Sequence, residues 1–493
     1  MSSSTSRSRQ ASRAPQSFLE CFSHFLTPRI WKQAQQMRKQ SAHRRQPRWQ
    51  TQPLIFVLLV MTWCAGDSLP ERFETARACY LALHQRRRRP GKTFAGFEKA
   101  LGKLALPVLR VVAKAVRWRI AQVFAERFLV DGFIPLGCDG SRLACPRSRE
   151  LEQRLGLGKR KKRKKKASQS VPLGPPPPEL APVPSPDNKK KDNLADSPQI
   201  WITAVVHLTL GVLWSWRLGK GTASEREHLR QLAATLPRLA LLVADAGYVG
   251  YKLLTALHGA GLFFLIRLSS QAPLYTPDRV GCWKRFQEGV VYYWPRWAQE
   301  KDLPPIPVRL LRIHSAKADV WLITNVLDAL KLPRRTAGRF YRWRWRNEGL
   351  FRDYKRTLGK VKLMSRTVAQ VHREAEGSLL ATQLLLAQGA LALHTTANVH
   401  IELPSVRKVL LEIRAEIRNI TGMYLGPRQG QTYLQRLAQA RWRKRRQRSK
   451  KVRRPWPGRK DHRPPRPPKI LKMGTILKVK LTKSLTSREA AIC

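Results

Sequence analysis

Acidic residues are scarce in this chain. The 493 residues include 32 Asp and Glu against 94 Lys and Arg, which gives a formal net charge of +62. Basic residues are most concentrated in 159–166 and 441–472, but the rest of the chain is also strongly basic. Because a body with this charge repels itself unless a polyanion compensates it, nucleic acid is the expected partner. A ribosome-associated or chromatin-like role would fit equally well, so the charge indicates the partner and not the reaction.

Paired cysteines and long apolar runs are also lacking. The seven cysteines are scattered and odd in number, which suits reduced thiols in a cytosol. Cys138 and Cys145 lack the second ligand pair that would indicate a zinc site. The apolar run 54–65 is far shorter than the ~20 residues of a membrane span, and we expect it to form a buried helix. With no signal-peptide layout at the start of the chain, we expect a cytoplasmic protein that does not enter the membrane.

Proline, glycine and charge runs divide the chain. Residues 1–26 are Ser/Arg-rich and predicted to be disordered. Residues 27–130 have a helical pattern punctuated by Pro53, Pro70 and Pro90. A basic helical domain at this place suggests recognition of DNA ends, and a plain structural subdomain is the alternative. The stretch 159–195 combines the octabasic run with PPPP and is predicted to be a flexible basic linker.

An α/β pattern occupies the middle of the chain, and 131–400 is predicted to be its core. Expected strands are 133–143, 200–208, 211–218, 239–244 and 262–268, with helices at 224–236 and 249–260. An aromatic, β-like stretch, 269–333, is predicted to be a separate, mostly-β insertion. C-terminal helices are expected within 401–440, and the basic tail 441–493 is predicted to be mostly disordered apart from a short strand at 476–481.

One string, YRWRWRNEGLFRDYK, carries the most chemical information. In a helix of about 100° per residue, its residues Tyr341, Arg344, Glu348 and Lys355 fall on one arc of roughly 60°. The large apolar residues of the string form a stripe on another side, suited to docking on a core. A carboxylate between two cations and a phenol suggests a site for a metal and a phosphate. The alternative is an amphipathic helix with a charged outer face.

Two upstream carboxylates stand where strands are expected to end. Asp139 lies in GCDGS and Asp245 in LLVADAGYVG. Taken alone, the first reads as an Asp-Gly hairpin turn and the second as a helix N-cap. Two Mg²⁺ ions about 3.5–4 Å apart, held by such carboxylates, are what breaking or forming a DNA phosphodiester requires. Asp353 falls about 140° from Glu348 on the helical wheel and Asp131 precedes its strand, so neither is expected in the site.

These features together resemble one family. The spacing Y-x2-R-x3-E-x6-K, with the boxes D-G-[ST] and D-x-G-[YF] upstream, is similar to the YREK signature of the insertion-sequence-four group of DDE transposases. The resemblance covers about 130–400 and implies a ribonuclease-H-like catalytic core, with a β-rich insertion between the second Asp and the Glu. It implies Asp139, Asp245 and Glu348 as catalytic ligands of two Mg²⁺ ions, with Mn²⁺ as a possible substitute.

The resemblance also implies DNA contacts. Tyr341, Arg344 and Lys355 would grip phosphates at the transposon end, which suits the guanidinium fork and the ammonium point charge. Trp345 would stack on a base, and Arg267 is a weaker phosphate candidate. Three tryptophans of the insertion are candidates for holding a flipped base, with core packing as the alternative role of each: Trp283, Trp294 and Trp297.

The leading hypothesis is a DNA transposase that cuts transposon ends in a metal-dependent reaction and transfers the strands into target DNA by cut-and-paste transposition. Its partners would be double-stranded DNA and a second copy in a homodimer on DNA, in the cytoplasm at a prokaryotic nucleoid. A metal-dependent nuclease without strand transfer is one alternative. A catalytically inactive DNA-binding descendant, or a basic architectural protein, is another.

Overall fold

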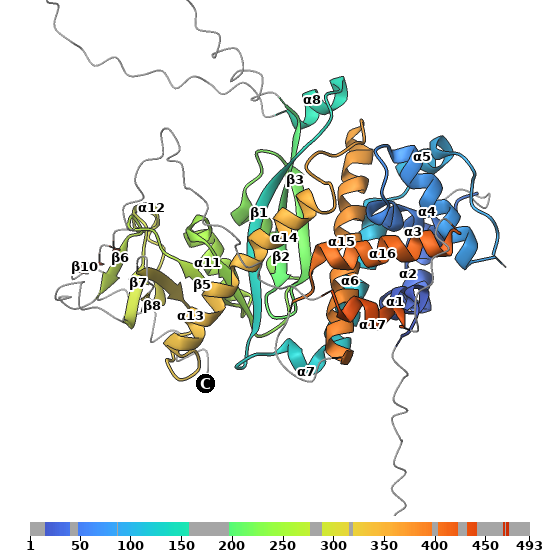
Figure 1. Ribbon diagram of the computed structural model, residues 1–493. Coiled ribbons are helices and arrows are strands. Elements are labelled where there is room, and N and C mark those ends of the chain that lie inside the picture. Colours follow the sequence, from blue (N-terminus) through green and yellow to red (C-terminus); the bar gives the residue numbers. More distant parts are fainter. Residues whose placement is uncertain are drawn as a thin grey trace, which may run out of the picture.

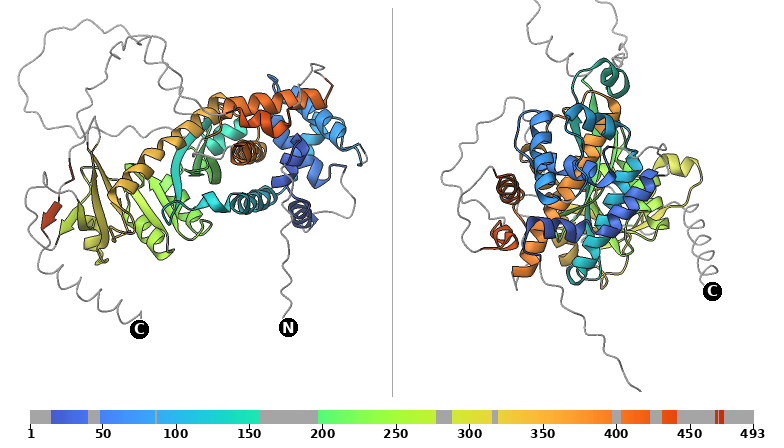
Figure 2. Two further views of the ribbon diagram at one scale, coloured as in Figure 1. Left: turned by 60° about the horizontal axis from the view of Figure 1, so that its bottom comes forward. Right: turned by 90° about the vertical axis from the view of Figure 1, so that its right-hand side faces the viewer.

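The computed structural model describes residues 15–39, 48–85, 87–156, 197–276, 288–314, 319–396, 403–422, 431–440, 467–468 and 470–472. The predicted linker 159–195, most of the basic tail and the strand expected at 476–481 lie outside these residues. Figure 1 shows a helical body at one end, a sheet through the middle, and further strands at the other end. The left view of Figure 2 shows the same separation, and in the right view the helical body lies in front of the sheet.

The N-terminal part is helical, as the sequence predicts for 27–130. Its helices are α1 (Phe18–Phe25), α2 (Pro28–Lys39), α3 (Thr51–Trp63), α4 (Leu69–Leu83), α5 (Phe94–Gly102), α6 (Leu106–Val123) and α7 (Ala125–Phe128). The side chains of Ser17, Ser68 and Thr93 cap α1, α4 and α5 by accepting backbone N–H groups. Helix α3 is buried along nearly its whole length, as expected for the apolar run.

The prediction of disorder for 1–26 is wrong for its last part. Helix α1 places Phe18, Phe22 and Phe25 in the core, with Phe18 against the ring of Tyr433 near the C-terminal end of the described chain. The Ser/Arg composition hides a short apolar periodicity that has partners only in the folded molecule.

One mixed sheet of ten strands runs through the molecule, in the order β10-β6-β7-β8-β9-β5-β4-β1-β2-β3. The strands are β1 (Ile134–Ala144), β2 (Gln199–His207), β3 (Val212–Lys220), β4 (Ala240–Ala244), β5 (Phe263–Arg267), β6 (Leu274–Thr276), β7 (Glu288–Tyr293), β8 (Ile306–Ile313), β9 (Val320–Thr324) and β10 (Ile470–Lys472). Strands β1, β4 and β5 are parallel, and β2 and β3 extend the sheet through antiparallel pairing.

The β-rich segment 269–333 differs from its prediction in one respect. It forms strands, but they continue the central sheet and do not make a sheet of their own. Strand β9 pairs antiparallel with β5, and β8, β7 and β6 follow outward from it. The exposed edge of β5 explains this, because unpaired N–H and C=O groups there offer a template for another strand. Strand β10, which the sequence does not predict, completes the outer edge beside β6.

The remaining helices cover this sheet and join it to the helical body. They are α8 (Arg149–Leu155), α10 (Glu225–Ala233), α11 (Tyr251–Gly259), α12 (Arg296–Glu300), α13 (Arg334–Trp343), α14 (Trp345–Arg356), α15 (Val368–Thr396), α16 (Val406–Ile420) and α17 (Tyr433–Ala438). Helix α15 is almost entirely buried and contacts α3, α6, α17 and β3. The Trp63 indole of α3 donates to the Ala381 carbonyl of α15, 3.2 Å away.

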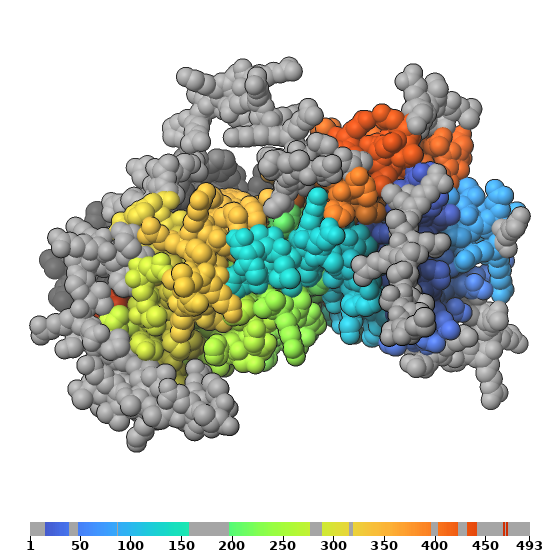
Figure 3. Space-filling view, turned by 90° about the horizontal axis from the view of Figure 1, so that it is seen from below, coloured from blue at the N-terminus to red at the C-terminus, as the bar shows by residue number. Residues whose placement is uncertain are grey.

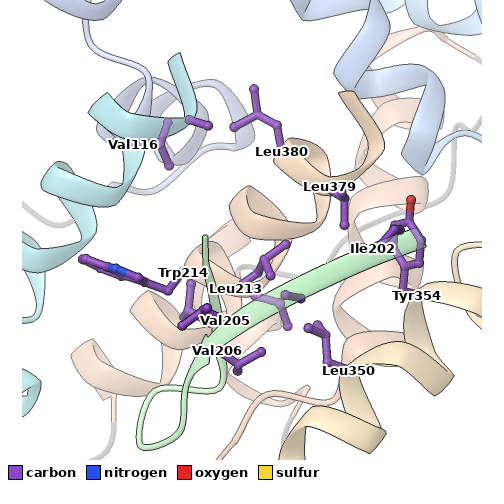
Figure 4. Close-up of a cluster of buried hydrophobic side chains, with 14 of the residues drawn as sticks. Val116, Ile202, Val205, Val206, Leu213, Trp214, Leu350, Tyr354, Leu379 and Leu380 are labelled. Atoms are coloured by element: carbon purple, nitrogen blue, oxygen red, sulfur yellow. The ribbon is translucent and has the colours of Figure 1, made fainter. Parts of the chain in front are cut away.

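The core beneath the signature residues is apolar. Figure 4 shows side chains of β2 and β3 meeting Leu350 and Tyr354 of α14 and Leu379 of α15. The apolar stripe predicted for this string therefore does dock on a core, with Phe351 and Leu358 also buried. No helix within the described residues is both long and apolar enough to cross a membrane.

Candidate active site

Asp139 lies in the middle of strand β1. The strand runs on to Ala144 and pairs with β2 throughout, with Asp139 opposite Ala204. The predictions of a strand end and of an Asp-Gly hairpin turn at this place are therefore both wrong. The long partner β2 holds the Asp-Gly pair extended. What does end near Asp139 is the pairing of β1 with β4, whose last matched residues are Gly137 and Val243.

Asp245 follows the last residue of β4, as predicted. It stands two residues beyond Val243, just as Asp139 stands two residues beyond Gly137, so the two carboxylates occupy equivalent places on neighbouring parallel strands. Asp245 also caps a short 3₁₀ turn, since its Oδ1 accepts the N–H of Ala246 at 2.8 Å. The predicted placement at a strand end is thus confirmed, whereas Asp245 is not the N-cap of the following helix, because α11 begins after Gly250 and has no side-chain cap.

The signature string forms two helices that meet at Arg344. Helix α13 ends at Trp343 and α14 begins at Trp345, and the N–H of Arg344 bonds to Tyr341 three residues back. The single continuous helix assumed for the 60° arc is therefore interrupted by a tighter turn. Tyr341 and Arg344 are buried, while Glu348 lies exposed in the first turn of α14. Figure 1 shows the two helices crossing the sheet beside β1.

A glycine lets α14 approach β1. A Cβ atom on Gly137 would lie 2.5 Å from the side-chain amide of Asn347, so no other residue fits without a shift. Asn347 is fully buried, and its amide has no hydrogen-bond partner within the described chain. This contact sets α14 directly over the strand that carries Asp139, and Glu348 is the next residue after Asn347.

Arg344 is the cation at the centre of this group. Its guanidinium lies 3.4 Å from the Glu348 carboxylate, and its side chain is only 7% exposed. It also lies over the rings of Tyr341 and Trp345, at 5.5 and 5.2 Å from their centres. A second cation, Arg267 at the end of β5, lies 3.9 Å from Asp245. Two guanidinium groups thus face the carboxylates.

The carboxylates interact electrostatically. Burial raises the pKa of Asp139, and the nearby Asp245 adds to the rise, while the Gly140 N–H and Arg344 oppose it. Burial likewise raises the pKa of Glu348, with Asp139 and Asp245 contributing and Arg344 opposing. Asp245 therefore acts on Asp139, and both aspartates act on Glu348, which places Asp139, Asp245 and Glu348 around one region.

The residues present fit divalent cations in chemistry. Three mutually repelling carboxylates with exposed oxygens are the hard donor set that Mg²⁺ prefers, and a cation between them would relieve the repulsion. Among the described residues, however, no three acidic, histidine or cysteine side chains stand close enough together to hold one ion as a preformed cluster.

The other predicted DNA-binding residues lie in different surroundings. Trp345 is exposed, with 62% of its surface accessible. Burial lowers the pKa of Lys355, which is half-buried on α14. Trp294 is a core residue whose indole donates to the Leu303 carbonyl, whereas Trp297 is exposed beside Tyr251. Trp283 lies outside the described residues.

The two carboxylates that the sequence analysis excluded from the site, Asp131 and Asp353, interact with other residues. Asp131 sits in a turn before β1 and pairs with Arg339. Asp353 interacts with Arg352 and Thr357. The sequence analysis missed a different acidic residue, Glu225, which lies close to the strand that carries Asp139. Its only sequence signal is its place at the start of a helix that follows β3.

Residues 168–384 match the family model of the transposase DDE domain. Asp245, Arg344 and Glu348 lie within this region, and Asp139 precedes it. The transposase InsG for insertion sequence element IS4 of Escherichia coli (strain K12) is 27% identical over 202 residues, which is 39% of this chain and 45% of that protein. Residues 168–384 are thus similar to a transposase DDE domain, and the chain spans less than half of that curated relative.

Among solved structures, the cryo-EM structure of the piggyBac transposase synaptic complex with hairpin DNA aligns over 88% of this chain and 86% of its own. The sequence identity is 11% and the TM-score is 0.40. This distant similarity adds nothing to the assignment.

Proposed function

We propose that this protein is a cut-and-paste DNA transposase, which cleaves DNA at transposon ends and transfers the freed strands into target DNA. The observation that carries the proposal is the placement of Asp139, Asp245 and Glu348 around Arg344, the last three of which lie within the region that matches the transposase DDE domain. The sheet order β3-β2-β1-β4-β5, with β1, β4 and β5 parallel, supports a ribonuclease-H-like core for it.

In this proposal Asp139, Asp245 and Glu348 hold two divalent cations, Mg²⁺ or Mn²⁺. When bound, the ions would lower the pKa of the attacking water or hydroxyl group and stabilise the negative charge on the leaving oxygen. Arg344 and Arg267 neutralise carboxylate charge and orient phosphate oxygens with their forked N–H groups. Tyr341 fixes the guanidinium of Arg344 by stacking, and exposed Trp345 offers a flat face to a base. Lys355 adds a phosphate contact further along α14.

The reaction is a displacement at phosphorus. A water oxygen forms a bond to the phosphorus atom at the transposon end, and the bond to the 3′ oxygen breaks. The released 3′-hydroxyl then attacks the second strand, which joins the two strands in a hairpin and releases the flanking DNA. A second water opens the hairpin and frees the 3′-hydroxyl again, and this hydroxyl attacks the target phosphodiester. At each step one bond to phosphorus forms as another breaks, the attacking oxygen loses a proton and the leaving oxygen gains one. The role of the protein is positioning and charge compensation.

The N-terminal helices are proposed to bind transposon-end DNA. A cavity of about 510 Å³ lies between the end of α2 and the start of α5, and five of its lining residues are cations: Arg38, Arg48, Lys92, Lys99 and Lys103. No acidic residue among those described lines it. A wall of cations suits the DNA backbone. Two ends must be brought together for cut-and-paste transposition, so we also propose a homodimer on DNA at the nucleoid of a prokaryotic cytoplasm.

The test is cleavage of a plasmid that carries the element's own ends, with Mg²⁺ and with EDTA. Wild type is expected to cut at the ends with Mg²⁺ alone, and Asp139→Ala and Glu348→Ala are expected to bind the ends but not to cut. Asp353→Ala is the matched control on α14 and should cut normally. Joining of pre-cut ends to a target plasmid separates a transposase from a nuclease. Tight binding without cutting by wild type would instead indicate an inactive DNA-binding descendant.

A further inference from the structure

Glu225 is an acidic residue whose position the three signature carboxylates do not explain. It is the first residue of α10, which packs against β1, β2 and β3 and is capped by the side chain of Ser224. Glu225 is half-buried, and it forms no ion pair within the described chain, although Arg142 and Arg226 are near enough to act on it. Burying a carboxylate without an ion-pair partner costs desolvation free energy, and this carboxylate has none among the described residues although the chain is rich in cations.

The backbone of β1 is shaped to admit this carboxyl group. A Cβ atom added to Gly140 would lie 2.9 Å from the carboxyl carbon of Glu225 and 2.6 Å from the ring of Trp201. Both contacts are closer than real Cβ atoms make, so a side chain here would push Glu225 away. Gly140 is the residue directly after Asp139, and its N–H donates to the Asp139 carboxylate at 2.8 Å. The glycine of the D-G-S box therefore brings Glu225 next to Asp139.

A buried phenol gives a second, independent sign of a ligand at this place. Tyr248 is 2% exposed, and its hydroxyl approaches the Glu225 carboxyl and the Cys138 thiol but makes no hydrogen bond of good geometry within the part of the chain that the structure describes. It lies beside Glu225 and Cys138, in the 3₁₀ turn that follows β4 and that Asp245 caps. A phenol hydroxyl is protonated near neutral pH, so it can donate a hydrogen bond to a ligand.

Electrostatic coupling connects the two sides. The groups that act on Glu225 include Asp139, Arg142, Arg226 and the Tyr248 hydroxyl, and those that act on Tyr248 include Asp139 and Glu225. Asp139 is thus shared between the group formed with Asp245 and Glu348 and the group formed with Glu225 and Tyr248.

We propose that Glu225 is a fourth acidic residue of the metal site and holds a divalent cation together with Asp139, with the Tyr248 hydroxyl donating to a ligand oxygen of that cation. Mg²⁺ takes six oxygen ligands. Because the three signature carboxylates form no preformed cluster, the coordination shell of the cation has room for a further carboxylate. This inference rests on the proposed function, since it extends the same site. Glu225 lies outside the motif that identifies the family, and its contact with Gly140 is what assigns it.

The experiment measures Mn²⁺ binding to the full-length protein without DNA, from the electron paramagnetic resonance signal of free Mn²⁺. Glu225→Gln is expected to weaken Mn²⁺ binding by about 10- to 100-fold. Glu227→Gln is the matched control, because Glu227 lies on the same helix but is paired with Arg230 at 2.7 Å. It should bind as wild type does.

Two further variants keep the test decisive. Gly140→Ala is expected to displace the Glu225 carboxyl by steric contact and to weaken Mn²⁺ binding without removing any charge. Glu225→Asp should recover part of the affinity, because it keeps the charge on a shorter side chain. Thermal unfolding in EDTA verifies that each variant is folded.

A second readout is the Mg²⁺ concentration that gives half-maximal end cleavage, which should rise by a similar factor in Glu225→Gln. Equal Mn²⁺ affinity for Glu225→Gln and Glu227→Gln would overturn the inference, whether or not the wild-type protein cuts DNA. Failure of wild type to cut, with Mn²⁺ binding lost only in Glu225→Gln, would instead count against the proposed reaction and support the assignment of Glu225.

Discussion

The buried pair of Lys360 and Glu374 provides a quantitative test of how α14 is held. The Lys360 ammonium lies 3.1 Å from the Glu374 carboxylate, and their side chains are 4% and 9% exposed. The same carboxylate accepts the N–H groups of Met364 and Ser365 at 3.0 and 2.9 Å. One side chain of α15 therefore fastens the whole turn that follows α14, the helix that carries Glu348.

Glu374→Gln should lower the free energy of unfolding by about 3–5 kcal/mol at pH 7, because it leaves the Lys360 ammonium buried without a counter-charge. Glutamine keeps the shape and one acceptor oxygen, so a cavity adds nothing to this value. Urea unfolding followed by tryptophan fluorescence measures the difference. Glu300→Gln is the control, since it removes an exposed pair with Arg296, and it should cost about 0.5 kcal/mol or less.

The effect of Glu374 should also depend on pH in a defined direction. Burial alone would raise the pKa of Glu374, but Lys360 and the two backbone N–H groups outweigh it and lower the pKa below the ordinary value. A lowered carboxyl pKa stabilises the fold above the unfolded pKa, and this stabilisation is lost as the pH falls through the folded pKa. The gap between wild type and Glu374→Gln should therefore shrink in acid. If the free energies of unfolding of wild type and Glu374→Gln differ by less than about 1 kcal/mol at pH 7, well below the loss expected for breaking a buried ion pair, Lys360 and Glu374 do not form one.

Two further predictions concern the site itself. Arg344→Ala should lower the free energy of unfolding by about 1–3 kcal/mol, because it leaves the carboxylates without their buried guanidinium. It should also make the logarithm of the DNA-end binding constant depend less steeply on the logarithm of the salt concentration, by about the amount of one phosphate contact. Affinity unchanged across salt concentrations would remove Arg344 from the phosphate contacts. Asp139→Asn should raise the midpoint of thermal unfolding by about 1–2 °C in EDTA, as expected for about 1 kcal/mol of relieved carboxylate repulsion in a protein of this size, and should abolish stabilisation by Mg²⁺. A lower midpoint in EDTA would show that Asp139 serves mainly to hold the fold.

The order of the elements from β1 to β5 could be predicted because each is marked locally. Alternating apolar residues, the Ser224 cap and the glycines punctuate that stretch, and the strands and helices lie within a few residues of their predicted places. The path of 269–333 could not be predicted, since sheet membership depends on which edge is free. The free edge of β5 is a property of the assembled sheet.

The sequence indicated candidate members of the site and not their geometry. The Y-x2-R-x3-E-x6-K spacing indicated Glu348, and the D-G-[ST] and D-x-G-[YF] boxes indicated Asp139 and Asp245. The helical wheel failed at Arg344, because the tighter turn there depends on burial of Tyr341 and Arg344 against the sheet. Glu225 could not be found from the sequence, since its closeness to Gly140 arises from packing of α10 across β1. Contacts of this kind have no local signature.

Helix α15 has a mechanical consequence. It has 29 residues, each adding about 1.5 Å along the axis. It packs against α3, α6 and β3 together, so the helical body and the sheet that carries the carboxylates share one hydrophobic core. Figure 3 shows the N-terminal helices and the α13 region at opposite ends of the same solid. A duplex gripped by the basic cavity at the helical end would reach the carboxylates at a fixed offset. The distance between the basic cavity and the carboxylates would then determine the position of the cut in the DNA.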